Sequence, residues 1–240
     1  MNPMTPMLNT LAQDAPDSGV SALELVAAGG LTAYAIIALS VVAAALVVMH
    51  MVQLRRSSLI PPDVVDELED LLERGDVDGA ARYCRDEEHD CALTRILDAG
   101  LTRCKRSVFG WLELKSALEE AGQEQVARLY RSTDWLGLIA AIAPMLGLLG
   151  TVIGMVGAFD TISASAGFAR PDQLAGDISK ALVTTLMGLF LAIPATAAFT
   201  YFRNRIDALS TEIAATIEDL TAPLDTSGAA PGAGAGGASA

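Results

Sequence analysis

Charged residues are missing from three long stretches of this 240-residue chain. No Asp, Glu, Lys or Arg occurs in residues 25–54, 135–159 or 181–202, which are 30, 25 and 22 residues long. A helix that rises about 1.5 Å per residue needs about 20 residues to cross a hydrocarbon core of about 30 Å. The sequence therefore predicts three membrane spans, and it excludes a soluble cytosolic enzyme.

The three spans also lack the side chains that carry protons or bind ions inside membranes. Such sites normally use Asp, Glu, Lys, Arg or His, and the only imidazole near a span is His50, little more than one turn before Arg55. The chain by itself therefore has no proton relay, and a second protein must bring the titrating group. The same absence leaves no base or metal site to activate a nucleophile, which argues against an intramembrane enzyme. Three spans also make no inverted repeat around a midplane site, as secondary transporters do.

Cysteine is scarce, and its three positions exclude a disulfide framework. Cys84, Cys91 and Cys104 all lie in the segment predicted to be cytoplasmic, where thiols stay reduced. Together with His89 they offer zinc ligands, but the gaps of 6 and 12 residues match no standard ligand spacing. We therefore favour buried structural thiols and expect no metal site.

Basic residues are concentrated in one segment, and this sets the expected orientation. Residues 55–134 contain 12 of the 16 Lys and Arg, whereas the first 30 residues contain none. Because cytoplasmic segments of membrane proteins are rich in Lys and Arg, we place 55–134 in the cytoplasm, the N-terminus outside and the C-terminus inside. The N-terminal stretch has no basic n-region, so we expect the first span to be a permanent anchor. The net charge of −13 argues against nucleic-acid binding.

Hydrophobic periodicity predicts an all-α integral membrane protein with three transmembrane helices, two of them extended into a helical cytoplasmic domain. No helix breaker separates 108–130 from the second span, and 206–220 continues the helical spacing of the third. The final residues are almost wholly Ala, Gly, Ser, Thr and Pro, which cannot bury a core. The expected segments are an extracytoplasmic N-terminal segment (1–28), transmembrane helix 1 (29–54), a cytoplasmic helical domain (55–134), transmembrane helix 2 (135–159), an extracytoplasmic loop (160–180), transmembrane helix 3 (181–202), a cytoplasmic helix (203–222) and a disordered tail (223–240).

Turn signals divide the cytoplasmic segment into several helices. The Pro-Pro-Asp sequence at 61–63 predicts a helix start, with Asp63 capping the free amides. Gly75 followed by Asp76 predicts the end of that helix and the beginning of another. A further amphipathic stretch begins at Ala92.

Small residues recur at helical spacing on one face of the second and third spans. Such stripes let helix backbones approach closely, whereas lipid gains nothing from them, so packing is their expected role. Thr151 and Thr185 fall at similar depths, as in a narrow polar lining, although a buried Thr often bonds the carbonyl four residues back without further role. The two prolines each free a backbone carbonyl inside the membrane. The residues of this packing and pore face are Ala140, Pro144, Gly147, Gly150, Gly154, Ala181, Gly188, Ala192 and Pro194.

Four motifs resemble the MotA/TolQ/ExbB proton-channel family, most closely its ExbB and TolQ members. The most specific are APMLGLLGTVIGM at 143–155 and ALVTTLMGLFLAIPA at 181–195, within a similarity that covers about 133–205. GDVDGAARYC at 75–84 and LDAGL at 97–101 are similar to the family's cytoplasmic region. MotA itself has four spans, so three spans favour ExbB or TolQ, which the sequence does not separate.

The resemblance implies a pore-forming stator subunit of a motor in the bacterial inner membrane, driven by the proton-motive force. It implies a homo-oligomeric ring in the lipid bilayer, expected to be a pentamer, around an ExbD- or TolR-like single-span partner whose membrane Asp takes and releases protons. Thr151 and Thr185 match the threonines that line the family's pore beside that Asp. Protons are then the coupling ion, no cofactor is expected, and a TonB- or TolA-like protein transmits work to the cell envelope, as in TonB-dependent import.

One position departs from the family pattern. ExbB-like members often have Glu just before the third span, in an ISEAL-type sequence, whereas this chain reads ISKAL with Lys180. The charge at this pore-mouth position is reversed, so we carry over no proton-entry role to Lys180. The alternative to a motor is a non-conducting oligomeric membrane scaffold whose cytoplasmic helices dock a partner.

Overall fold

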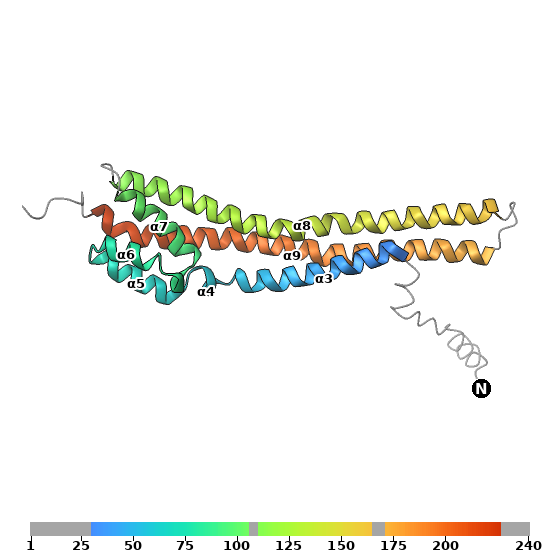
Figure 1. Cartoon of the computed structure of the whole chain (residues 1–240), viewed down its shortest axis with the longest axis horizontal. Helices are drawn as coiled ribbons and strands as arrows, with labels where there is room; N and C mark the ends of the chain where they lie inside the picture. The colour runs from blue at the N-terminus through green and yellow to red at the C-terminus, as the bar shows by residue number, and fades with distance from the viewer. Residues whose placement is uncertain (1–29, 106–109, 165–170, 227–240) are drawn as a thin grey trace, which may run out of the picture. The chain divides into compact units, whose positions relative to one another are not determined.

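The computed structural model describes residues 30–105, 110–164 and 171–226, and every regular element within them is a helix (Figure 1). Three helices are long and apolar enough to cross a membrane: α3 (Gly30–Gln53), α8 (Gly110–Ala164) and α9 (Pro171–Thr226). The predicted all-α fold with three membrane helices is confirmed. The expectations for 1–28, and for the part of the tail after Thr226, lie outside the described residues.

Two of these helices are far longer than a membrane span. α8 has 55 residues and α9 has 56, whereas about 20 suffice to cross the hydrocarbon core. The prediction that two spans continue as long helices is confirmed. Helix also occupies 160–164 and 171–180, in the predicted loop, and α9 passes through Pro223. A helix that is already formed adds residues at little cost, so the polar sequence at these ends does not stop it.

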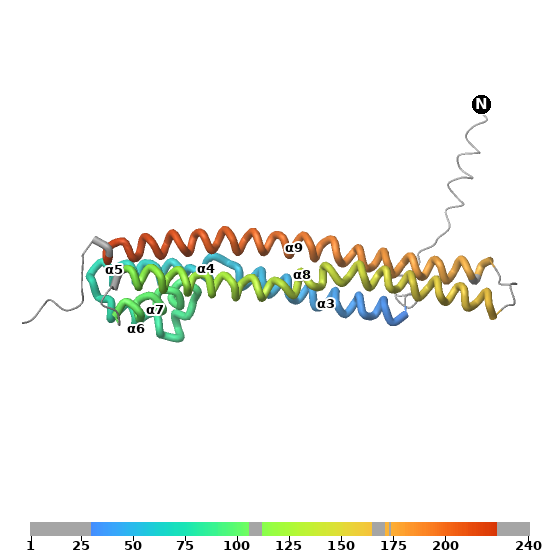
Figure 2. The backbone as a smooth tube through the Cα atoms, turned by 90° about the horizontal axis from the view of Figure 1, so that it is seen from above, coloured from blue at the N-terminus to red at the C-terminus, as the bar shows by residue number. Residues whose placement is uncertain are grey.

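The chain divides into two compact units, Met1–Ala38 with Ala143–Phe190 and Leu39–Ile142 with Leu191–Ala240. In the first unit, the described parts of α8 and α9 lie side by side (Figure 2). They run antiparallel, since Gly154 faces Ala181 and Ala143 faces Gly188. Small residues therefore form the centre of this unit.

In the second unit, several short helices gather beside the first part of α8 and the last part of α9 (Figure 1). They are α4 (Arg56–Leu59), α5 (Pro62–Glu73), α6 (Val77–Tyr83), the 3-10 helix η1 (Glu87–His89) and α7 (Ala92–Cys104). Large aliphatic side chains fill the centre, in contrast to the first unit. The fully buried ones are Leu68, Leu72, Leu93, Ile96, Leu97, Leu101, Leu114, Leu136, Ile206 and Leu209.

The start of α5 differs in one detail from the sequence prediction. Pro61 is the N-cap residue and makes no side-chain cap bond, so the prediction that Asp63 caps this helix is wrong. Asp63 instead lies in the first helical turn, where its charge favours the helix dipole. The predicted break at Gly75 and Asp76 is confirmed: Gly75 has a φ of 72°, and Asp76 Oδ1 accepts the Gly79 amide at 2.7 Å.

The packing of α7 against α8 depends on a glycine and a cap. Thr94 donates its hydroxyl to the His89 carbonyl at 2.9 Å and accepts the Cys91 amide at 3.0 Å, which fixes the start of α7. A Cβ added to Gly100 would lie 2.6 Å from Leu118 Cδ2, so the absence of a side chain lets α8 approach. These contacts position the short helices on the long one.

Candidate functional site

Within the first unit, the parts of α8 and α9 drawn in yellow and orange in Figure 2 meet along a seam of small residues. The stripes that the sequence pattern singled out contact each other, because small side chains allow close backbone approach. The facing groups are Gly154 with Ala181, Gly150 with Thr184, Gly147 with Thr184 and Thr185, and Gly188 with Ala143 and Gly147.

Two glycines are required by the closeness of the helix backbones. A Cβ added to Gly188 would lie 2.6 Å from the carbonyl oxygen of Ala143, and one added to Gly147 would lie 3.0 Å from Thr185 Cα. Backbone atoms cannot move aside as a flexible side chain can, so alanine at either position would separate the helices. At Gly157, by contrast, an added Cβ would meet nothing within 4 Å in the described chain.

Thr184 is a residue of the seam that the sequence pattern missed. Its side chain is only 2% exposed, and a Cβ at Gly150 would lie 2.3 Å from its hydroxyl oxygen. The Thr184 hydroxyl donates to the Ala181 carbonyl at 2.7 Å and lies 3.4 Å from the Gly147 carbonyl oxygen. Steps of four and three residues from Ala181 reach Thr185 and Gly188, whereas a first step of three residues reaches Thr184. Both steps fit helical spacing, so periodicity alone does not separate the two threonines.

Thr185 and Thr151, the two threonines predicted to line a pore, are both half-buried. The Thr185 hydroxyl donates across the seam to the Gly147 carbonyl at 3.0 Å, whereas the Thr151 hydroxyl donates within α8 to Leu148 at 2.7 Å. Thr151 follows Gly150, and Gly150 faces Thr184, the residue before Thr185. Thr151 and Thr185 therefore lie at about the same level of the helix pair. Each hydroxyl oxygen retains lone pairs that can accept a further hydrogen bond.

The remaining residues of the predicted face are divided between buried and exposed positions. In the first unit Ala181 is buried and Pro144 is half-buried; in the second unit Ala140 and Ala192 are buried. Pro194 is exposed. As proline has no N–H, each proline leaves the carbonyl four residues earlier without its usual helical partner.

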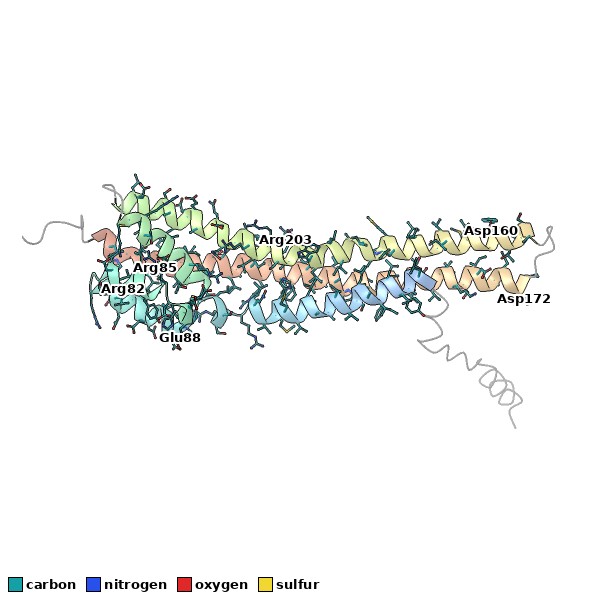
Figure 3. The ribbon with its side chains drawn as sticks, in the orientation of Figure 1. Arg82, Arg85, Glu88, Asp160, Asp172 and Arg203 are labelled. Atoms are coloured by element: carbon teal, nitrogen blue, oxygen red, sulfur yellow. The ribbon has the colours of Figure 1, made fainter. Side chains whose placement is uncertain are left out.

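Lys180 and several acidic residues lie at the end of the first unit where α8 ends and α9 begins. Figure 3 shows Asp160 of α8 and Asp172 of α9 at this end, and Lys180 Nζ lies 3.5 Å from Asp177 Oδ1, one turn away on the same helix. The Lys180 side chain is 54% exposed, so solvent screens this pair. The Asp177 carboxylate therefore neutralises only part of the positive charge that Lys180 brings to this end of α9.

His50, the imidazole near the first span, is a packing residue in the second unit. It is fully buried, with its ring centroid 5.5 Å from that of Phe202 in α9. Its Nδ1 lies 2.6 Å from the Leu46 carbonyl oxygen, while Nε2 has no partner among the described residues.

The three cysteines lie among hydrophobic and capping contacts. Cys84 and Cys91 are buried and Cys104 is half-buried. Burial raises the pKa of the Cys84 thiol to about 12, and it raises that of Cys104 as well. Cys91 is the N-cap residue of α7. These environments agree with the interpretation of structural thiols.

Comparison with known proteins gives the same assignment as the motifs. A family model described as the MotA/TolQ/ExbB proton channel family matches residues 89–215, more than half of the chain. The chain belongs to this family. The match takes in every residue of the small-residue seam, and it places this family member among multi-pass membrane proton channels rather than enzymes.

Similar proteins include both ExbB and TolQ, so this family member is not assigned to one branch. It is 43% identical over 86 residues to biopolymer transport protein ExbB of Xanthomonas campestris pv. campestris, covering 36% of this chain and 34% of that protein. The chain therefore matches about a third of that relative's length. Putative biopolymer transport protein ExbB-like 3 of Synechocystis is 31% identical over 204 residues, covering 82% and 90%. Tol-Pal system protein TolQ of Haemophilus influenzae is 32% identical over 108 residues, covering 45% and 47%.

Proposed function

We propose that this chain is the pore-forming stator subunit of an inner-membrane motor driven by the proton-motive force. One observation carries the proposal: the spans contain threonines on a tightly packed helix seam, yet none of them contains a carboxylate. A channel built from this chain alone has nothing to titrate. A partner that inserts an acidic side chain beside the threonines supplies the missing group.

In this proposal, several copies form a ring, taken as a pentamer, around an ExbD- or TolR-like single-span partner with a membrane Asp. The half-buried hydroxyls of Thr151 and Thr185 face that carboxyl group and exchange hydrogen bonds with it as it gains and loses a proton. Gly147, Gly150, Gly154 and Gly188 keep α8 and α9 close enough to hold the threonines in place. Lys180 and Asp177 lie at the mouth of the pathway.

The proposed topology follows from the distribution of bases. Residues 55–134 and 203–222 lie in the cytoplasm, and residues 1–28 and 160–180 lie outside. The ring then transmits partner movement to a TonB- or TolA-like protein that works on the cell envelope. Similarity to proteins named ExbB and TolQ supports coupling to either a TonB-like or a TolA-like protein. TonB-dependent import is the function that we propose to test first.

Substituting Thr185 by Val tests the pore assignment. The change keeps the side-chain volume and removes the hydroxyl, so we expect proton uptake by proteoliposomes containing the complex to fall at least tenfold. Thr151→Val should give a similar loss. The matched control is Thr200→Val, because Thr200 is exposed and its hydroxyl donates only to Thr196 of its own helix. Proton uptake that is equal in all three variants and the wild type would contradict the pore role.

The alternative is a non-conducting scaffold. It is favoured by one observation, that the hydroxyls of Thr151 and Thr185 already have acceptors inside the chain. A scaffold predicts that the complex assembles and that its output is unchanged when the proton gradient is collapsed. The motor predicts loss of output under that condition.

A further inference from the structure

Basic residues in the second unit fall into two classes according to their ion pairs. Between Arg74 and Arg128, six of the eight described Lys and Arg have a carboxylate oxygen within 4 Å. Lys115 and Arg82 are the two exceptions. Five further arginines lie within five residues of an uncharged stretch, and we call them the boundary arginines: Arg55, Arg56, Arg131, Arg203 and Arg205.

Within the described residues, only one boundary arginine has such a partner, although the chain carries 29 acids against 16 bases. Arg56 pairs with Glu212. The other four have no carboxylate within 4 Å among the described residues, and the Arg131 side chain donates only to the Ala127 carbonyl of its own helix, at 3.3 Å. In the described part of this acidic chain, four of the five boundary arginines are therefore left available to an anion from outside the chain.

Arg203 contacts two aromatic rings and has no carboxylate oxygen within 4 Å among the residues that the structure describes. Its guanidinium carbon lies 5.0 Å from the Tyr130 ring centroid and 5.4 Å from that of Phe199. Asp207, one turn away, accepts the Tyr130 hydroxyl. Aromatic faces stabilise the charge of a guanidinium while leaving the N–H groups at its edge unoccupied. Such an edge matches the geometry of a phosphate.

Aromatic side chains indicate that the boundary arginines lie at the membrane surface. Trp135 is 64% exposed and Tyr201 is 63% exposed, and both lie at the ends of uncharged stretches, next to the boundary arginines. Trp and Tyr are enriched at the depth of lipid headgroups. Three carboxylates lie within seven residues of a boundary arginine along the chain: Asp134, Asp207 and Glu212. Together with the five boundary arginines they give a net charge of +2.

We propose that Arg55, Arg131, Arg203 and Arg205 bind the phosphate groups of anionic phospholipids in the leaflet next to residues 55–134. The headgroups replace the carboxylates that these arginines lack. Because the remainder of the segment is strongly acidic and an anionic leaflet repels it, the boundary arginines also hold the acidic helices at a fixed distance from the membrane.

The test is native mass spectrometry of the full-length protein in detergent with equal amounts of phosphatidylglycerol and phosphatidylcholine. The wild type should carry more phosphatidylglycerol than phosphatidylcholine. Each base near an anionic surface changes lipid binding by about fivefold, so Arg131→Gln with Arg203→Gln should lower the ratio of the two adducts by about tenfold or more. The matched control is Lys115→Gln with Arg82→Gln, which removes two bases that also have no carboxylate within 4 Å in the described chain but lie away from the uncharged stretches. Its ratio should equal that of the wild type.

Three results would overturn the proposal. The first is a ratio of phosphatidylglycerol to phosphatidylcholine adducts that is the same in the Arg131→Gln, Arg203→Gln variant and the wild type. The second is a fall in this ratio in the Lys115→Gln, Arg82→Gln control as large as that in the boundary variant. The third is loss of bound phosphatidylglycerol on adding millimolar glycerol phosphate, since that result would mean a site for soluble anions. If the double glutamine variant does not fold, Arg203→Lys serves instead: it keeps the charge but loses the planar fork, and a ratio between those of the wild type and Arg203→Gln is expected.

Discussion

At the scale of single residues, the threonines of the seam show how polar groups are accommodated in an apolar helix pair. Thr184 and Thr185 both approach the Gly147 carbonyl oxygen, at 3.4 and 3.0 Å. Because each hydroxyl has a backbone acceptor, neither requires water or a charge to be buried. The sequence alone predicted a threonine on this face but selected only Thr185, since periodicity does not show which hydroxyl lies opposite a glycine.

Thiol reactivity is a prediction at the same scale. Thiol-reactive reagents attack the thiolate, and a pKa of about 12 leaves Cys84 protonated from pH 7 to 9. We expect maleimide to label the half-buried Cys104 of the folded protein first and to leave Cys84 unlabelled over that range until the protein is unfolded. Rapid labelling of Cys84 at pH 7 would contradict the buried-thiol interpretation, and zinc in the purified protein would favour the metal site.

At the scale of helices, α8 and α9 determine the architecture. Long uncharged stretches predicted the membrane parts of both, because the cost of burying charge in lipid is large enough to be visible in composition. The helix ends were harder to predict: α9 begins at Pro171 and passes Pro223, where composition indicated a loop and a tail. The short elements α4 and η1, of 4 and 3 residues, are too brief for any periodicity to reveal.

The close approach of α8 and α9 yields a prediction about stability. Gly188→Ala places a methyl group against the Ala143 carbonyl oxygen, so we expect the free energy of unfolding to fall by about 1–3 kcal/mol. Gly157→Ala is the matched control, because it meets nothing within 4 Å and should raise helix stability by up to about 1 kcal/mol. Unfolding in mixed detergent, followed by circular dichroism, measures both. Equal midpoints for the two variants would show that the seam is not tightly packed.

At the scale of the whole molecule, the distribution of charge organises the chain. Apolar helices carry no titrating group across the membrane, and the acidic short helices carry most of the ion pairs. Family membership was predictable from the motifs at 143–155 and 181–195, because the residues that pack α8 on α9 are the ones those motifs contain. The unpaired boundary arginines could not be predicted, since a sequence does not show which bases find a carboxylate.

The most direct test of the motor assignment is native mass spectrometry of the complex purified from its own membranes in mild detergent, with every co-purifying chain identified. The account predicts several copies of this chain together with a single-span protein that has an Asp in its membrane segment. That result would supply the carboxylate that the three spans lack. A homo-oligomer without such a partner, obtained at native expression level, would contradict the account and leave the scaffold as the function.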